Sequence, residues 1–213
     1  MPHEIAALYV ERGGCYFGLD GVDPWDEERD ARRYAGAVPV VAHPPCQRYG
    51  RYWSGGPSAK VRRQKGDDGG CFAHALWSVR TFGGVLEHPE ASHAWRMFGL
   101  LTPPYHGGWV NADDRGGWTC CVAQGHYGHR AQKLTWLYAN GVTLPSLRWG
   151  RARGRLRLDA GAKSTAERQA PGWEAPPRVT SQENYRTPEV FRDLLISIAR
   201  TATSRPLSLK PLI

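Results

Sequence analysis

The sequence predicts an α/β fold in which the sheet carries its functional site at the carboxyl ends of the strands. Short apolar runs typical of buried strands alternate with segments of helical spacing. Polar, chemically versatile residues follow directly after several of these runs. The chain has 213 residues, of which 41% are hydrophobic, so it is long enough for one domain with a sizeable core.

The first half of the chain is expected to supply strands and helices in alternation. Apolar runs, one of them rich in valine, predict strands at residues 4–10, 38–42 and 85–89. Apolar spacing predicts helices at 71–82 and 91–98, and charged residues favour a further short helix at 26–35. Glycine pairs mark turns at Gly13-Gly14 and at Gly83-Gly84.

The second half ends in a helix that is expected to dock on the core. Residues 118–123 and 133–139 are typical of two more strands around a polar loop. Thr187 is a residue type suited to the N-cap of a helix over 188–200, and Pro188 fits the first turn of that helix. The expected apolar face of this helix consists of Val190, Leu194, Leu195 and Ile198. We therefore divide the chain into a core (1–149), a basic Pro- and Gly-rich arm or linker (150–186), a docked helix (187–200) and a tail (201–213).

The charge of the chain favours a polyanionic partner. The formal net charge is +8 at pH 7, and basic residues are dense at 60–65 and 148–155. Such a field favours nucleic acid, with ordinary surface charge as the alternative. The sequence shows no signal peptide, no apolar stretch of membrane-spanning length and five cysteines, an odd number. We therefore expect a cytoplasmic protein with free thiols, no membrane partner and no obligate protein partner.

Cys46 follows an expected strand and two prolines. Prolines fix φ and remove backbone donors, so the stretch HPPC at 43–46 predicts a stiff exit from the strand and a defined direction for the thiol. A positioned thiol can act as a nucleophile, and Arg48 and Arg51 would favour its thiolate form. The alternative is a small buried hydrophobe.

Glu87 directly follows an apolar run. A carboxyl group in that position is costly to bury without a partner, and partial desolvation tends to raise its pKa, so that it can donate a proton. The alternative is a glutamate that caps a helix or forms a salt bridge.

The polar loop 124–133 (QGHYGHRAQK) joins two expected strands. It gathers histidine, arginine, lysine and glutamine side chains, which can hold a base edge and a phosphate. The alternative is an exposed polar hairpin.

Three residue pairs have the spacing of metal ligands: His43 with Cys46, Cys71 with His74, and His126 with His129. However, Cys71 and His74 fall within an expected helix. Cys120 and Cys121 are adjacent on an expected strand, so their side chains point to opposite faces. We therefore expect no metal site.

Together these stretches resemble the DNA (cytosine-5) methyltransferase family, in the same order along the chain. The stretch 8–19 (LYVERGGCYFGL) is similar to that family's cofactor loop, L-F-x-G-x-G-G-x-x-x-G-L. HPPCQ at 43–47 resembles the nucleophile loop G-P-P-C-Q, and LEHP at 86–89 resembles the E-N-V or E-N-P motif. The stretch from Tyr127 to Lys133 resembles, in a weakened form, Y-G-x-P-Q-x-R-x-R.

The resemblance implies a fold and a reaction. The fold would be a Rossmann-like three-layer sheet, an abbreviated methyltransferase-like domain with its C-terminal helix docked on the core. Cys46 would add to C6 of a flipped-out cytosine in DNA, while Glu87 would hydrogen-bond N3 and the exocyclic amine. C5 of the ring would then take a methyl group from S-adenosylmethionine.

The resemblance also implies binding residues. Those around the substrate would be Pro45, Gln47, His88, Tyr127, Arg130 and Lys133, with Lys133 at the base O2 or a nearby phosphate. Those around the cofactor would be Gly13, Gly14 and Asp23, or Asp26 in place of Asp23.

The chain departs from the family pattern in ways that keep other functions open. Glu11 stands where the cofactor loop has its first glycine, few residues separate this loop from Cys46, and His88 replaces the usual asparagine. No large target-recognition domain is visible, which indicates a compact, divergent relative of the kind that phages carry. One alternative is a nucleic-acid-binding protein without catalysis. The other is an enzyme that attacks C6 but takes its group from another donor, or acts on a free nucleotide. Thymidylate synthases use the same attack on C6 with a folate carbon as the donor.

Overall fold

The computed structural model of the chain describes residues 4–50, 53–55, 60, 63–152, 154–156, 158, 169 and 177–203. It contains a seven-stranded mixed sheet with the order β2-β1-β3-β4-β7-β6-β5. The strands are β1 (Ile5–Leu8), β2 (Val22–Trp25), β3 (Val40–Ala42), β4 (Gly84–Pro89), β5 (Val110–Asn111), β6 (Gly117–Ala123) and β7 (Leu134–Asn140). Strands β2, β1, β3 and β4 run parallel, whereas β7 is antiparallel to both β4 and β6, and β5 is antiparallel to β6. The predicted α/β class is confirmed.

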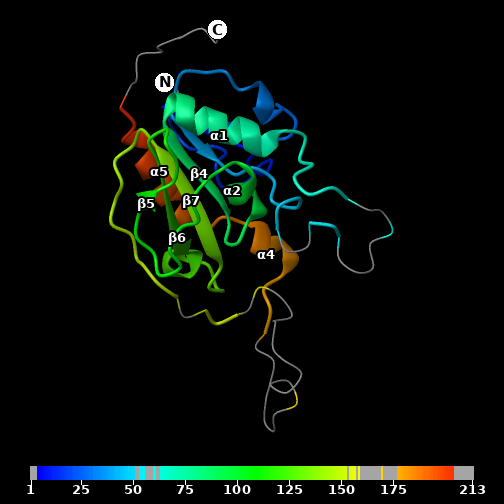
Figure 1. Ribbon diagram of the computed structural model, residues 1–213. Coiled ribbons are helices and arrows are strands. Elements are labelled where there is room, and N and C mark those ends of the chain that lie inside the picture. Colours follow the sequence, from blue (N-terminus) through cyan, green and yellow to red (C-terminus); the bar gives the residue numbers. More distant parts are fainter. Residues whose placement is uncertain are drawn as a thin grey trace.

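Helices cover both faces of the sheet (Figure 1). On one face α1 (Cys71–Phe82) packs on β3 and β4, and α2 (His93–Met97) adds to the same core. On the other face α5 (Glu189–Arg200) packs on β1, β3 and β4, so the expected docking of the C-terminal helix is confirmed. Leu8 of β1 belongs to the first core and its neighbour Ala7 to the second, as the two-residue period of a strand requires.

The helix on each face buries a row of large side chains. α1 inserts Phe72, Leu76 and Val79, each of which is at most 2% exposed. Full burial of one such side chain stabilises the fold by about 2 kcal/mol. In α2 the buried Trp95 donates its Nε1 hydrogen to the Thr119 hydroxyl of β6 at 3.1 Å, which satisfies the polar atom of the indole.

The apolar face of α5 differs from the predicted one. Val190 is 59% exposed, and the neighbouring Phe191 is fully buried instead. Phe191 lies four residues before Leu195 and seven before Ile198, which is the spacing of one helix face. The helix begins at Glu189 with Pro188 as its N-cap residue and without a side-chain capping bond, so the expected Thr187 cap is wrong.

Several elements were not expected from the sequence. Strand β2 contains Pro24, which is tolerated because β2 is an edge strand. The expected helix at 26–35 is reduced to a single 3-10 turn, η1 (Ala31–Arg33). The short α4 (Ser181–Tyr185) lies in the predicted arm, and η2 (Gln124–Tyr127) lies in the polar loop.

Some predicted features fall on residues that the structure does not describe. Arg51, most of the arm (153, 157, 159–168 and 170–176) and the tail after residue 203 lie outside the described residues. Within the described residues, no helix is both long and apolar enough to span a membrane.

Candidate active site at the carboxyl ends of the strands

The carboxyl ends of β1, β3, β4 and β6 lie along one edge of the sheet, and β7 starts from that edge. From β1 the chain goes outward to β2 and then returns to β3 on the other side of β1. In open α/β sheets such a change of direction creates a crevice outside the carboxyl ends, where ligands bind. Both stretches that carry Cys46 and Glu87 reach this edge.

Cys46 lies in the turn that follows β3. The His43 N–H group still bonds the Leu8 carbonyl at 3.0 Å, so the loop keeps the sheet register until the two prolines. The Cys46 carbonyl then accepts the N–H groups of Tyr49 and Gly50, both at 3.0 Å. Tyr49 is buried in the core and anchors the turn, while the Cys46 side chain stays half-buried.

The two residues beside Cys46 are exposed. Pro45 and Gln47 both face solvent, whereas Pro44 is buried. The predicted substrate-binding residues Pro45 and Gln47 therefore flank the thiol at the surface, where a substrate can reach them.

Glu87 lies near the end of β4 with both carboxylate oxygens bonded. Nδ1 of His43 lies 3.0 Å from Oε2, while Oε1 accepts from the Thr135 hydroxyl and from Gln124 Nε2, the latter at 3.2 Å. Burial raises the pKa of Glu87, but the bond and charge of His43, the charge of Lys133 and the Thr135 hydroxyl together hold it at about 2. The expectation of a raised pKa is therefore wrong, because these partners come from distant parts of the sequence.

Cys46, Glu87 and Lys133 act on one another electrostatically. Burial raises the pKa of the Cys46 thiol and the charge of Glu87 adds to that effect, whereas Lys133 lowers it. Burial lowers the pKa of Lys133, and Glu87 and Cys46 oppose this. The expected low thiol pKa is thus wrong. The cation that acts on the thiol is Lys133 rather than Arg48, and Arg51 lies outside the described residues.

His88 points away from this cluster into the core. It is fully buried against the rings of Tyr49, Phe72 and Trp95, and its Nδ1 lies 2.7 Å from the Ser92 hydroxyl. Burial lowers the pKa of His88 to about 4, so the ring is neutral at pH 7. The structure does not bring this predicted substrate contact to the site, because adjacent strand residues face opposite sides.

Two other predicted substrate contacts lie away from the thiol. The Tyr127 ring packs on Phe191 of α5, with centroids 5.6 Å apart. Arg130 is exposed and forms two 2.6 Å bonds to the carboxylate of Glu183 in α4. Of the polar loop, the structure brings only Lys133, together with Gln124, to Cys46 and Glu87.

The predicted cofactor loop follows β1 as a series of turns, without a helix between residues 9 and 21. Gly13 has φ +63°, and a Cβ atom placed there would meet nothing within 4 Å, so the loop has room above it. At Gly14 a Cβ atom would lie 2.8 Å from the Glu11 carbonyl oxygen, so this turn needs glycine. The turn therefore depends on glycine at position 14, while position 13 borders open space.

The predicted ribose ligand is engaged within the protein. Asp23 lies inside β2, where its carboxylate accepts from Trp25 Nε1 at 2.7 Å and from Arg29 at 2.6 Å. Asp26 follows the strand directly, is 6% exposed and accepts the Arg29 N–H group at 3.0 Å. If Asp23 contacted a ribose, its carboxylate would have to accept from the ribose hydroxyl in addition to Arg29 and Trp25.

The segment between α4 and α5 crosses the edge of the sheet. Lys133 donates from Nζ to the Arg186 carbonyl at 3.0 Å, and the Cys15 thiol lies 3.6 Å from the Thr187 carbonyl. Arg192 of α5 donates to the Cys15 carbonyl at 2.8 Å. We call residues 183–192 the strap, because they tie the loop after β1 to the residue before β7.

Sequence reasoning missed Thr135 and Gln124 as partners of Glu87. Thr135 is the second residue of β7 and pairs with Pro89 of β4, so only the antiparallel register of β7 reveals its neighbour. Gln124 is 1% exposed and directly follows β6. The available signal in the sequence was an amide side chain directly after an apolar run, because such a group needs a polar partner wherever the fold buries it.

The described residues contain no group of three or more His, Cys, Asp or Glu side chains that could hold a metal ion. Cys120 and Cys121 belong to the two separate cores, on opposite faces of the sheet. His43, the ligand candidate beside Cys46, bonds Tyr16 and Glu87 instead.

The chain has no match among protein-family models, curated proteins or solved structures. A functional assignment therefore depends on the residues and on their geometry.

Proposed function

We propose that the protein modifies C5 of a pyrimidine base in DNA, most simply by methylating cytosine, through covalent addition of Cys46 to C6. The observation that carries this proposal is the convergence of Cys46, Glu87 and Lys133. They come from the turn after β3, from β4 and from the residue before β7. Glu87 and Lys133 both act on the pKa of Cys46, and Glu87 and Lys133 act on the pKa of each other. C6 addition needs a thiol nucleophile, a partner for the ring edge and a cation for the charge that develops.

Each of the three side chains has its own role in this reaction. The Cys46 thiolate attacks C6, Glu87 holds the N3 edge of the ring, and Lys133 faces O2 or a nearby phosphate. The change of strand direction beside the loop after β1 supports a Rossmann-like arrangement with the cofactor in that crevice. When bound, S-adenosylmethionine supplies a methyl group on a sulfonium centre, and the turn at Gly13 and Gly14 would hold it.

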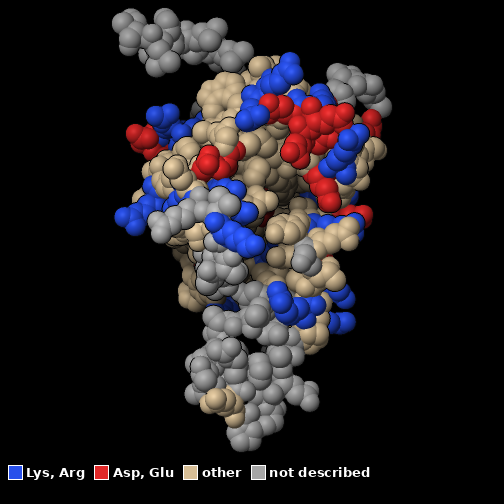
Figure 2. All heavy atoms as spheres, turned by 90° about the vertical axis from the view of Figure 1, so that its right-hand side faces the viewer, with Lys and Arg blue, Asp and Glu red and all other residues tan. Residues whose placement is uncertain are grey.

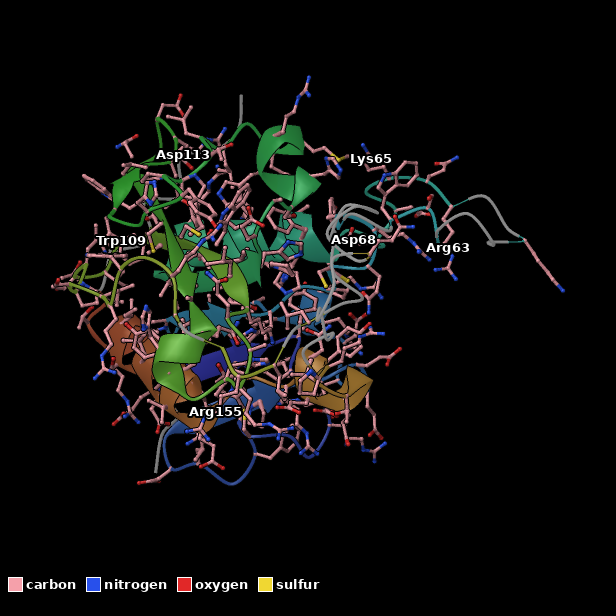
Figure 3. The ribbon with its side chains drawn as sticks, turned by 90° about the horizontal axis from the view of Figure 1, so that it is seen from below. Arg63, Lys65, Asp68, Trp109, Asp113 and Arg155 are labelled. Atoms are coloured by element: carbon pink, nitrogen blue, oxygen red, sulfur yellow. The ribbon has the colours of Figure 1, made fainter. Side chains whose placement is uncertain are left out.

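Surface charge supports DNA as the substrate. Basic side chains are spread over one face of the molecule around a separate acidic cluster (Figure 2). Arg63 and Lys65 extend from the segment before α1, at the opposite end from Trp109 (Figure 3). The net charge of +8 and these exposed cations provide contacts for phosphates.

One observation favours a second function, nucleic-acid binding without catalysis. The thiol pKa is raised, so the resting nucleophile is protonated at neutral pH. The position of Glu87 beside Cys46 and Lys133 argues for the enzyme, because binding alone does not need a largely shielded carboxylate beside a thiol.

The test uses duplex DNA that contains 5-fluorocytosine, with and without S-adenosylmethionine. A covalent adduct that requires the cofactor and disappears in Cys46→Ser supports the methyltransferase. Cys71→Ser is the matched control, because Cys71 is also half-buried but lies at the start of α1. DNA binding without an adduct, unchanged in Cys46→Ser and in Glu87→Gln, would contradict the enzyme. Mass spectrometry of nucleosides from expressing cells identifies the product, including a group other than methyl.

A further inference from the structure

Three side chains from separate elements form a chain of hydrogen bonds into the site. The Tyr16 hydroxyl, in the loop after β1, lies 2.8 Å from Nε2 of His43. Nδ1 of His43 lies 3.0 Å from Oε2 of Glu87. Tyr16 is 3% exposed, and the side chains of His43 and Glu87 are 12% and 13% exposed, so the chain is shielded but Glu87 can still be reached.

The bonds to Glu87 leave one position for a substrate. A carboxylate has about four acceptor positions, and Oε1 uses two of them for Thr135 and Gln124. The single Thr135 hydroxyl proton goes to Glu87, so Gln124, 3.2 Å away, must donate to the Thr135 oxygen. Oε2 accepts from His43 and keeps one position open. A ring nitrogen bound there meets a carboxylate that has no proton of its own.

Addition of a thiolate to C6 requires a proton at this point. The electron pair of the C5–C6 double bond moves through C4 to N3, and N3 takes up a proton. Glu87 is ionised, so the proton must come from a neighbour. The titratable and charged groups that surround His43 and its partners are Cys15, Tyr16, Cys46, Glu87, His88, Lys133, Arg192 and Asp193.

Most of these groups are unsuited to supply that proton. The buried ring of His88 is neutral at pH 7, and its Nδ1 is bonded to Ser92. Lys133 directs Nζ to the Arg186 carbonyl. Burial raises the pKa of Tyr16 well above its ordinary value, so Tyr16 keeps its hydroxyl proton. Among the residues that the structure describes, His43 alone has a nitrogen in direct contact with Oε2.

We propose that His43 is a positioning residue that stores the proton for N3 and passes it through Glu87, with Tyr16 holding the ring in place. This inference rests on the proposed function. The proton moves from Nδ1 to Oε2, rotation about the Cδ–Oε2 bond presents it to N3, and Cys46 becomes bonded to C6. After C5 has been modified, the proton on N3 returns to the pair formed by Glu87 and His43. The C5 hydrogen then leaves as a proton, and the C6–sulfur bond breaks to restore the Cys46 thiolate.

The Tyr16 hydroxyl suits either state of His43. When the imidazole is charged, Nε2–H donates to the Tyr16 oxygen; when it is neutral, the Tyr16 hydroxyl donates to Nε2. The same proton movement also helps Cys46. The charge of Glu87 raises the pKa of the thiol, so protonation of Glu87 removes that effect at the moment of attack.

The experiment measures release of tritium from C5 of cytosine in DNA, without cofactor, as a function of pH. In the wild type we expect the rate to rise with pH as Cys46 loses its proton. His43→Asn keeps a donor toward Glu87 but has no transferable proton. We expect it to lower the rate by about 10²-fold or more at every pH, because no proton can then pass from residue 43 to Glu87. Tyr16→Phe should lower the rate less.

His74→Asn is the matched control. His74 also accepts or donates to a tyrosine hydroxyl, that of Tyr9 at 3.0 Å, but its other nitrogen faces the Tyr34 carbonyl instead of a carboxylate. Its rate and pH profile should equal those of the wild type. Exchange in His43→Asn with a wild-type rate and profile would overturn the inference alone, whereas no exchange in the wild type would overturn the proposed function as well.

A second measurement does not depend on the stability of the variants. Nitrogen-15 spectra of the histidine rings in the wild type report the protonation of His43 directly. We expect Nδ1 of the ring to carry a proton at the pH of the maximal rate, as its bond to Glu87 requires. An Nδ1 atom without a proton at that pH would refute the storage of a proton there.

Discussion

The carboxylate of Glu87 should stabilise the fold as well as the reaction. Its pKa is about 2 in the folded protein, against an ordinary value of 4.5. At 1.36 kcal/mol for each pKa unit, this difference corresponds to about 3 kcal/mol of stability near neutral pH. Because the folded pKa is the lower one, this stability is complete above pH 4.5 and is lost as the pH falls toward 2. About 2 kcal/mol of it should be gone at pH 3.

The assay is urea unfolding of the wild type and of Glu87→Gln between pH 7 and pH 3. The variant keeps the size of the side chain but has no charge for His43, so the difference in unfolding free energy should shrink by about 2 kcal/mol over this range. Glu183→Gln is the control, because the Arg130–Glu183 pair is exposed on the arginine side and should contribute little. A difference between wild type and Glu87→Gln that stays constant with pH would refute the reasoning.

Three further predictions follow from the structure. Gly84→Ala should destabilise the protein by about 4 kcal/mol or more in urea unfolding, because a Cβ at φ +127° overlaps the Val40 carbonyl. Gly99→Ala, at φ +69° with open space around the Cβ, should cost only about 1 kcal/mol, and equal effects would contradict the steric argument. Lys133→Met should raise the pKa of Cys46, which is seen as slower alkylation of that cysteine at pH 8 by peptide mass spectrometry; an unchanged rate would remove Lys133 from the cluster. DNA affinity, measured by fluorescence anisotropy, should fall by about 100-fold between about 50 and 200 mM salt, and a flat response would exclude phosphate contacts.

The sequence predicted elements with strong local patterns. The α1 helix has the predicted bounds, Cys71–Phe82, because its apolar spacing ends at a glycine pair. The edge strand β2 carries a proline and was missed, and Val190 was assigned to the buried face in place of Phe191. Such errors arise where tertiary position decides the outcome, since a local pattern does not show which strand is at an edge or where a helix begins.

In the candidate site, too, the sequence predicted the reactive residues but not the effects of their neighbours in the fold. Its two reactive residues, Cys46 and Glu87, were visible as polar groups after apolar runs. Their pKa values were predicted with the wrong direction. His43, Lys133 and Thr135 lower the pKa of Glu87, and burial and Glu87 raise the pKa of Cys46, only after the sheet has formed. Burial and charge partners are properties of the fold, so a motif gives the identity of a reactive group but not its protonation state.

The strap has a consequence for the order in which the protein is made. A ribosome synthesises the chain from its N-terminus, so Cys46 and Glu87 emerge long before Thr187 and Arg192. Until α5 has emerged, one face of the sheet has no apolar cover, and Cys15 lacks both of its contacts with the strap. Lys133, which acts on the Cys46 thiol, likewise gains its bond to the Arg186 carbonyl only when the strap is in place, so the surroundings of the thiol are completed near the end of translation.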